Sequence, residues 1–289
     1  MLTWGFNFVA VKLLYQQMTP AALAIVRFVP MYLLLVLVCK LRKERLQYTR
    51  DTLPVLWQGF VSMGVYMLLF LEGMRLTNAA EGAIMLATAP IFSAIFSVMA
   101  KYERFTPGAI LGAVIAFVGT ATVIAAGSKT GGGTLAGNAM LISSAIVWAY
   151  GAVLSKPLVK KYSPVQSLAL SMPGAILILV PYSIWDAMQK PWTPATAYTH
   201  QTWWMLVHVI VGAGVIGFVG FYEGVKEIGP AQAMLYQYFV PILAAISAYL
   251  VFHTSLNLVQ AVGLAVVIGG VAFATRARLV AARRELATT

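Results

Sequence analysis

Four charged residues stand in or beside apolar stretches, where a charge needs a counter-ion or water. Lys12 and Lys156 are 144 positions apart, and Glu72 and Glu223 are 151 positions apart. A charge at the centre of a membrane-spanning helix costs roughly 2.5–3.5 kcal/mol on insertion scales, so it needs a partner or a wet cavity. We expect two ion pairs, Lys12–Glu72 near one membrane face and Lys156–Glu223 near the other, each closing one end of a pathway in turn.

The same acidic residues allow other roles. Arg75 follows Glu72, and Lys226 follows Glu223, at a spacing of three residues. Residues spaced in this way face each other on a helix, so both couples could form static local pairs. Glu72, Glu81 or Glu223 could instead carry a coupling proton. Gating, static pairing and proton coupling all remain open from the sequence.

A second group of residues could line a binding cavity at mid-depth of the apolar stretches. Aromatic rings suit apolar or aromatic small molecules, and amide and hydroxyl groups fix their orientation. Ordinary helix packing or anchoring at the membrane interface is the alternative for each side chain. The candidates for substrate binding are Asn7, Tyr66, Met85, Thr88, Trp148, Tyr150, Tyr222, Tyr236 and Gln237.

The composition indicates what kind of scaffold positions these residues. Hydrophobic residues make up 60% of the 289 residues and charged residues 10%, whereas a soluble domain is about half apolar and about a quarter charged. The chain therefore has too little polar surface to be soluble. In lipid the backbone must satisfy its own hydrogen bonds, which helices do without partners. We predict an all-α integral membrane protein.

Ten apolar stretches are long enough, or nearly so, to cross a bilayer, which takes about 20 helical residues. The first stretch is short, and we expect part of its helix to precede residue 1. The ten predicted transmembrane helices cover residues 2–18, 21–39, 54–75, 79–100, 106–126, 138–158, 164–185, 202–226, 230–252 and 256–275.

The chain contains an internal repeat. The segment Phe70–Pro90 matches Phe221–Pro241 without a gap at an offset of 151, and an offset of 144 aligns Trp4 with Trp148. Each half then holds five predicted spans. Because five is odd, the halves enter the membrane from opposite sides, which makes an inverted repeat and provides a route to alternating access.

We therefore predict two inverted five-helix repeats in a chain of four parts. Residues 1–127 form the first repeat, and residues 128–137 form a glycine-rich linker. Residues 138–275 form the second repeat, and residues 276–289 form a basic cytoplasmic tail.

Basic residues predict the orientation. With the amino terminus in the cytoplasm, the inner connections and the span ends beside them hold 15 of the 20 Lys and Arg residues. The outer connections and their span ends hold 3, and Lys12 and Arg27 lie deeper inside spans. This bias follows the positive-inside rule. We expect a bacterial-type inner membrane, with both termini cytoplasmic. The net charge of +11 needs no nucleic acid, because inner loops face anionic lipid.

Several motifs resemble those of the EamA-type branch of the drug/metabolite transporter superfamily. They are the run Trp4–Lys12, Arg27-Phe28 after Pro20, Ala79-Ala80 to Pro90, Glu103-Arg104, and the glycines at 112 and 119. The resemblance covers nearly the whole chain. It implies ten helices in two inverted halves around a central cavity, and commonly the export of amino acids or other small metabolites.

The second half departs from this pattern at two places. Thr254 and Ser255 stand where a second Glu-Arg pair would fall, and Ser171 stands where the first half has Arg27. Those polar contacts are therefore expected on one side only.

Other function classes lack their motifs. There is no phosphate-binding loop, the three histidines show no metal spacing, and no Ser/His/Asp grouping suggests hydrolysis. We predict a secondary transporter, an exporter of amino acids or related small metabolites that is not an enzyme and has no cofactor or metal. Alternatives are efflux of drugs or other hydrophobic metabolites, and a non-transporting receptor or enzyme. The expected partners are a small-molecule substrate and lipid, with proton coupling open and the chain monomeric.

Overall fold

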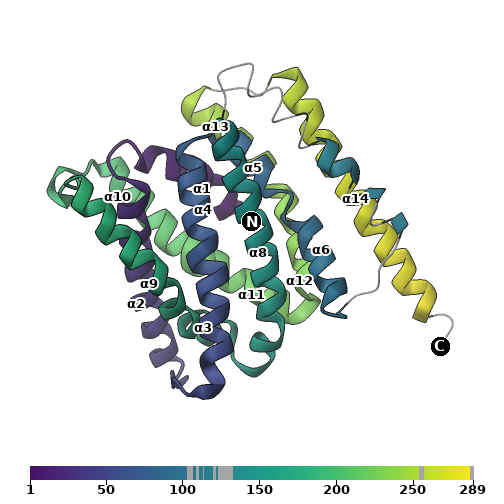
Figure 1. The fold of residues 1–289 in the computed structure, drawn as a ribbon, viewed down its shortest axis with the longest axis horizontal. Coiled ribbons are helices and arrows are strands. Elements are labelled where there is room, and N and C mark those ends of the chain that lie inside the picture. Colours follow the sequence, from purple (N-terminus) through teal and green to yellow (C-terminus); the bar gives the residue numbers. More distant parts are fainter. Residues whose placement is uncertain are drawn as a thin grey trace.

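The computed structural model describes residues 1–102, 107–108, 111–112, 114–119, 122, 133–253 and 257–286, and these residues form helices and connections without strands (Figure 1). Some sequence predictions lie outside the described residues. These are the Glu103-Arg104 pair, the Thr254-Ser255 departure, ten of the 21 residues of the fifth predicted span, linker residues 128–132 and tail residues 287–289.

The first half begins with short and long helices that alternate with turns. Thr19 caps the second of them, since its hydroxyl accepts a hydrogen bond from the Ala22 N–H at 3.1 Å. The described elements are α1 (Leu2–Leu14), α2 (Pro20–Leu41), η1 (Arg50–Thr52), α3 (Leu53–Gly59), η2 (Phe60–Val65), α4 (Tyr66–Arg75), α5 (Ala79–Leu86) and α6 (Ala89–Met99).

The second half follows the same order with longer helices. Its described elements are α8 (Leu135–Lys161), α9 (Pro164–Gln189), η3 (Ala195–Ala197), α10 (His200–Val207), η4 (His208–Ile216), α11 (Gly217–Ile228), α12 (Pro230–Leu235), η5 (Tyr236–Tyr238), α13 (Phe239–Phe252) and α14 (Leu258–Leu286).

Two helices extend across predicted boundaries between parts of the chain. α8 starts at Leu135, within the predicted linker, where the Thr134 hydroxyl accepts a hydrogen bond from the Gly137 N–H. α14 continues from the second predicted repeat into the predicted basic tail and ends at Leu286.

Seven helical segments of the described chain are long and apolar enough to cross a membrane. Two shorter apolar helices, Leu2–Leu14 and Tyr236–Phe252, accompany them. The protein is therefore a multi-pass membrane protein whose described secondary structure is all helical. The seven segments are Pro20–Leu41, Arg50–Arg75, Ala79–Met99, Leu135–Lys161, Pro164–Gln189, His200–Ile228 and Leu258–Ala281.

Two helical segments are broken at matching places. The helix that starts at Ala79 is interrupted at Ala87 and Thr88, before Pro90, and the helix that starts at Pro230 is interrupted by η5, before Pro241. Proline has no N–H and clashes with the carbonyl four residues earlier, so a helix breaks just before it. The two prolines are 151 positions apart, and so both breaks belong to the repeat.

Two π-helical segments also recur at matching places. The segments η2 and η4 end at Val65 and Ile216, which are 151 positions apart. π-Helical turns are rare and often occur at functional sites. The indole N–H of Trp4 donates to the Ala213 carbonyl within η4 at 2.9 Å, which joins α1 to this segment.

Glycines allow a close contact between residues 112–119 and α14. A Cβ atom on Gly112 would lie 2.3 Å from the Gly270 carbonyl oxygen, and one on Gly119 would lie 2.8 Å from the Gly263 oxygen. The lower-numbered Gly112 approaches the higher-numbered Gly270, and Gly119 approaches Gly263. The residue numbers therefore rise along one segment as they fall along the other, which means that the two segments run antiparallel. Small residues on membrane helices permit this close approach of backbones.

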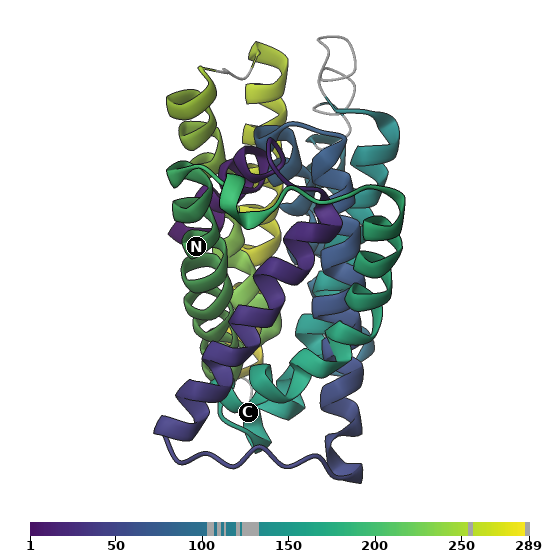
Figure 2. The ribbon, with the colours of Figure 1, turned by 90° about the vertical axis from the view of Figure 1, so that its left-hand side faces the viewer.

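The connections lie at two ends of the helical bundle (Figure 2). The segment 42–49, between α2 and α3, and the carboxyl end of α14 lie toward one end, and the connection between α9 and α10 lies toward the other. Within the bundle, α1 packs against α13 and α8 packs against α6, while η2 packs against α9 and η4 against α2. The two halves thus interleave through equivalent elements.

Candidate functional site

A cavity lies at the centre of the bundle, where helices from both halves meet. About 30 Å³ is open to the centres of water molecules, and a single water needs about 10–15 Å³. The cavity therefore has room for about two or three waters in this conformation. Its lining residues are Trp4, Asn7, Phe8, Arg27, Tyr66, Met67, Phe70, Ala83, Leu86, Ala87, Trp148, Phe218, Gln237 and Val240.

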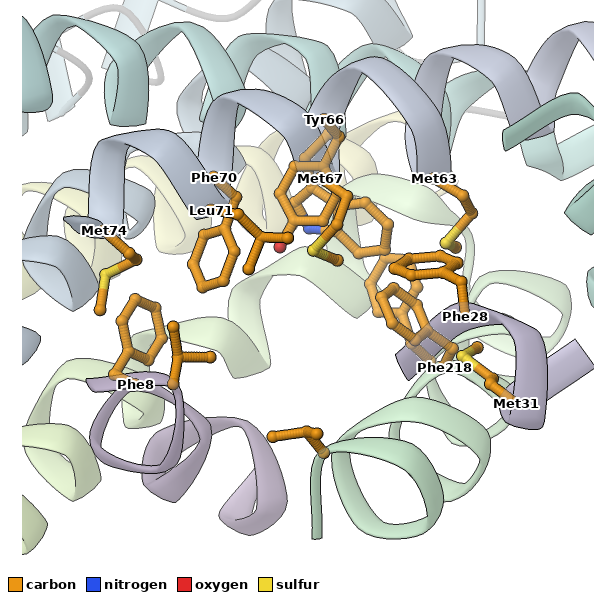
Figure 3. Close-up of a cluster of buried hydrophobic side chains, with 14 of the residues drawn as sticks. Phe8, Phe28, Met31, Met63, Tyr66, Met67, Phe70, Leu71, Met74 and Phe218 are labelled. Carbon is orange, nitrogen blue, oxygen red and sulfur yellow. The ribbon is translucent and has the colours of Figure 1, made fainter. Parts of the chain in front are cut away.

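Aromatic rings form the frame of this cavity. The ring of Trp148 lies 5.8 Å from that of Trp4, 5.1 Å from that of Tyr66 and 5.6 Å from that of Phe218. Several of these contacts are edge-to-face, an arrangement that fixes ring positions. Figure 3 shows side chains of η2 and α4 directed toward those of α1, α2 and α11; it labels Phe8, Phe28, Met31, Met63, Tyr66, Met67, Phe70, Leu71, Met74 and Phe218.

Three polar side chains on the cavity each leave one buried atom without a hydrogen-bond partner. These atoms are Oδ1 of Asn7, Nε of Arg27 and Nε2 of Gln237. All three side chains are almost fully buried. Buried polar atoms nearly always have partners, and a group without one is a position that a ligand or water can satisfy. The residues that line the cavity thus carry one acceptor and two donors without partners, inside an aromatic frame.

Arg27 is the charged member of this set. It is 1% exposed, its Nη1 lies 3.9 Å from the Met67 sulfur, and its guanidinium carbon lies 5.9 Å from the Phe28 ring centroid. Within the described chain, no carboxylate oxygen lies within 4.0 Å of its nitrogens. The guanidinium is therefore held between a thioether and an aromatic ring, without a counter-ion among those residues.

The broken helices border the cavity. Leu86 and Ala87 line it at the break between α5 and α6, and Gln237 and Val240 line it at the break around η5. Discontinuous helices near the bilayer midplane place backbone groups beside substrate sites in secondary transporters. The helix breaks before the matched prolines thus form part of the wall of this cavity.

The lining is partly symmetric. Met67 and Phe218 are 151 positions apart, as are Leu86 and Gln237, and all four line the cavity. The polar residues break this symmetry, because the partner of Arg27 at an offset of 144 is Ser171, which does not line it.

Four of the nine predicted binding residues lie on the cavity: Asn7, Tyr66, Trp148 and Gln237. The other five lie elsewhere in this conformation. Their placement follows from the helix faces that carry them, because neighbouring residues on a helix point about 100° apart.

Each of these five side chains has another environment. Tyr222 is fully buried and its hydroxyl meets Nε2 of Gln58 at 2.5 Å, outside the cavity. The Thr88 hydroxyl donates to the Met85 carbonyl, and Met85 is fully buried. The remaining two, Tyr150 and Tyr236, are exposed, with Tyr150 against Phe96.

The predicted ion pairs are not formed in this structure. Glu72 instead accepts from Nε of Arg75 at 2.9 Å and from the Tyr182 hydroxyl. The local pair that the sequence offered as an alternative is thus present, because a three-residue spacing brings these side chains together without help from another helix.

The second predicted pair is also apart. The ammonium of Lys156 lies over the Tyr102 ring at 4.2 Å from its centroid. Glu223 is half-buried and forms no ion pair among the described residues. A cation–π contact therefore takes the place of the expected Lys156–Glu223 bridge in this conformation.

Sequence reasoning missed Arg27 as a site residue, along with the apolar lining residues Met67, Phe70 and Phe218. Arg27 carried a signal, since it is a basic residue that lies well inside a predicted span and not at its end. A charge at that depth needs a partner or a cavity. The sequence gives no such signal for the apolar lining residues, because an apolar side chain that lines a cavity has the same residue type as one that packs in the core.

The acidic residue Glu81 belongs to a separate polar cluster. Its Oε2 accepts from the Gly133 N–H at 2.7 Å, and its Oε1 accepts from Nε2 of Gln260 at 2.7 Å. Glu81 is 1% exposed and links α5 to α14 and to the residues before α8. Among the described residues, no group of three His, Cys, Asp or Glu side chains could hold a metal ion.

The fold and cavity define a class of protein: a multi-pass helical membrane protein with an internal polar and aromatic cavity between discontinuous helices. The model of the EamA-like transporter family matches residues 1–125 and 135–276. The chain belongs to that family, and the resemblance noted from its motifs is confirmed. Family membership indicates a transporter rather than an enzyme.

Similar proteins are named as transporters. The chain is 24% identical to the uncharacterized transporter YyaM of Bacillus subtilis, over 92% of this chain and 88% of that protein. It is 25% identical to a probable terminal-alkyne amino-acid exporter of Streptantibioticus cattleyicolor, over 99% of this chain and 94% of that protein. One crystal structure, described only as that of a protein, matches 96% of this chain and 95% of its own with a TM-score of 0.72 at 19% identity. It supports the fold alone.

Proposed function

We propose that this protein is a secondary transporter that exports amino acids or related small metabolites by alternating access around the central cavity. The observation that carries the proposal is the cavity itself. It presents three unpartnered polar groups within an aromatic frame, between two helices broken at mid-span. Such a site suits a small molecule that has both polar and apolar parts.

An inverted arrangement of the two halves belongs to this proposal. Gly112 faces Gly270 and Gly119 faces Gly263, while Gly112 and Gly263 are themselves repeat partners, as are Gly119 and Gly270. Such exchanged, antiparallel contacts are those of a two-fold axis perpendicular to the helices. An axis in the membrane plane relates inverted repeats, which can exchange their two packings to open opposite sides.

The substrate class has support from one relative. A protein 25% identical over nearly the whole of this chain is named a probable amino-acid exporter. The direction of export and the amino-acid class come from that likeness. The second candidate is efflux of hydrophobic drugs or metabolites, which the largely aromatic and aliphatic lining favours.

Orientation is part of the proposal as well. The segment 42–49 and the carboxyl end of α14 lie toward the same end of the bundle (Figure 2), and both carry clustered basic residues. The positive-inside rule places that end in the cytoplasm. Both termini of the predicted ten-helix chain would then be cytoplasmic.

The gating pairs remain a proposal for another conformation. Lys12–Glu72 and Lys156–Glu223 would each form when its end of the pathway closes, which requires Glu72 to exchange its bond with Arg75. Single charge reversals at Lys156 and Glu223 should abolish transport, and the double exchange should restore it. A double exchange that restores nothing would remove the gates from the mechanism.

Flux into proteoliposomes tests the proposed function. The purified protein is reconstituted and supplied in turn with labelled amino acids and with labelled hydrophobic drugs, beside liposomes without protein. We expect saturable flux of at least one amino acid. Flux of drugs alone would favour the second candidate, and no flux of any solute would contradict transport.

A further inference from the structure

The buried guanidinium of Arg27 has no counter-ion among the described residues, although it lines the central cavity. Resting on the proposed transport function, we infer that this guanidinium binds the carboxylate of the substrate, and that the cavity takes zwitterionic α-amino acids.

Burial of the positive charge of Arg27 costs free energy. Removing an ion from water costs several kcal/mol even after the protein relaxes. A methionine sulfur at 3.9 Å and a ring at 5.9 Å are weak compensation for a guanidinium. A carboxylate that enters the cavity provides the missing charge and accepts the unused hydrogen bonds.

The geometry of Arg27 suits such a ligand. Its Nη1 is directed at the Met67 sulfur, and the edge formed by Nε and Nη2 makes no hydrogen bond to the described residues. That edge presents two parallel N–H donors. A carboxylate binds such an edge with both oxygens, in the strongest common arrangement of an ion pair.

Packing does not explain the charge. The repeat partner of Arg27 is Ser171, whose hydroxyl donates to the Leu168 carbonyl of its own helix α9. The equivalent position in the second half is therefore filled by a small neutral side chain. The fold therefore accepts a neutral side chain at this repeat position. The charge of Arg27 is then explained by its place on the cavity and not by helix packing.

The other two unpartnered atoms complete the recognition of an amino acid. Oδ1 of Asn7 can accept from an ammonium group, and Nε2 of Gln237 can donate to a carboxylate. The rings of Trp4 and Trp148 can add cation–π attraction to the ammonium. The present cavity is too small for a whole amino acid, so binding must accompany an opening of the bundle.

Paired probes that differ only at the carboxylate test this inference. L-Phenylalanine is compared with L-phenylalaninamide, and L-leucine with L-leucinamide, as flux into proteoliposomes. The unaltered protein should move each acid about tenfold faster than its amide, or more, because charge-assisted hydrogen bonds contribute about 1.5–3 kcal/mol. Arg27→Gln should reduce acid flux by a similar factor and leave amide flux within about twofold.

Two further variants keep the test decisive. Arg27→Lys keeps the charge but loses the two-donor edge, so the preference for the acid should fall part of the way. Ser171→Ala, at the repeat partner, should leave both fluxes unchanged. Unfolding temperature and gel filtration show whether each variant is folded. If Arg27→Gln does not fold, the flux ratio of Arg27→Lys decides the test.

The outcomes separate the two proposals. Equal flux of acid and amide in the unaltered protein would overturn the role of Arg27, and so would a preference that survives both substitutions. Flux of drugs without flux of either acid would overturn it too. Each of these results leaves transport itself intact, whereas no flux of any solute would contradict the proposed function.

Discussion

The carboxylate of Glu81 joins three segments that are far apart in the sequence, and replacing it should loosen the bundle by an amount that can be worked out. Its oxygens accept from the Gly133 N–H, from Nε2 of Gln260 and from the Thr77 hydroxyl at 3.4 Å. The Thr77 hydroxyl has a second acceptor, Oδ1 of Asn138, at 3.2 Å. Glu81→Ala therefore leaves two buried donors without partners.

Each buried donor without a partner costs about 1–3 kcal/mol. Glu81→Ala should thus destabilise the protein by about 2–6 kcal/mol, which lowers the apparent unfolding temperature by on the order of 10 °C for a chain of this size. Glu81→Gln should cost about half as much, because its amide oxygen keeps one donor satisfied while its NH₂ faces the NH₂ of Gln260.

A reciprocal variant sharpens the prediction. In Glu81→Gln combined with Gln260→Glu, the new carboxylate at position 260 accepts from the amide at position 81. It also accepts from the Asn257 N–H, as the Gln260 oxygen does now at 3.1 Å. All donors regain partners, so the double variant should recover most of the stability lost by Glu81→Gln.

Thermal unfolding in detergent at a fixed scan rate measures these effects, with Glu223→Gln as a control, because Glu223 makes no ion pair among the described residues. The control should unfold at the temperature of the unaltered protein. If the double variant were no more stable than Glu81→Gln, counting hydrogen-bond partners would not explain the role of Glu81.

Three more predictions follow from packing and from the cavity. Gly59→Ala should destabilise by about 1–3 kcal/mol in thermal unfolding, because the new Cβ would lie 1.8 Å from a carbonyl oxygen of α9, whereas Gly220→Ala has open space and should not destabilise. Pro241→Ala should mend the break around η5 and lower the maximal flux several-fold without lowering stability; unchanged flux would show that the break has no part in transport. Trp148→Ala should raise the KM for an aromatic amino acid by about tenfold, since burial of such a ring contributes about 1.5–3 kcal/mol, and an unchanged KM would remove Trp148 from the site.

The sequence was sufficient for the membrane-spanning class and for much of the helix order. Seven predicted spans coincide with helices that are long and apolar enough to cross a bilayer. Hydrophobic runs of that length form helices in lipid, because a helix satisfies the hydrogen bonds of its own backbone. The matched prolines at 90 and 241 also mark the places of the two breaks, because the ring of proline acts on its own helix whatever surrounds it.

The candidate site was only partly predictable. Asn7 and Gln237 stood out because a polar amide within an apolar run is unusual, and both line the cavity. Tyr150 and Tyr236 looked equally suitable but face outward. Their neighbours in sequence, Ala149 and Gln237, are buried, so a shift of one residue separates the two environments.

Partners from distant segments were decided by the tertiary structure alone. Glu81 meets Gln260 across 179 positions, and Glu72 meets Tyr182 across 110 positions. Nothing in the local sequence of either acid names these partners. Whether Arg27 has a counter-ion likewise depends on the side chains of every helix that packs around it, and none of the described ones provides a carboxylate.

The sequence by itself therefore determined that this chain crosses a membrane in helices, where two of those helices break, and that its halves repeat. Only the tertiary structure decided which helix faces meet at the cavity and which charges find partners. The physical reason is that hydrophobicity and proline act along a single helix, whereas the rotation of each helix about its axis is set by the side chains of its neighbours.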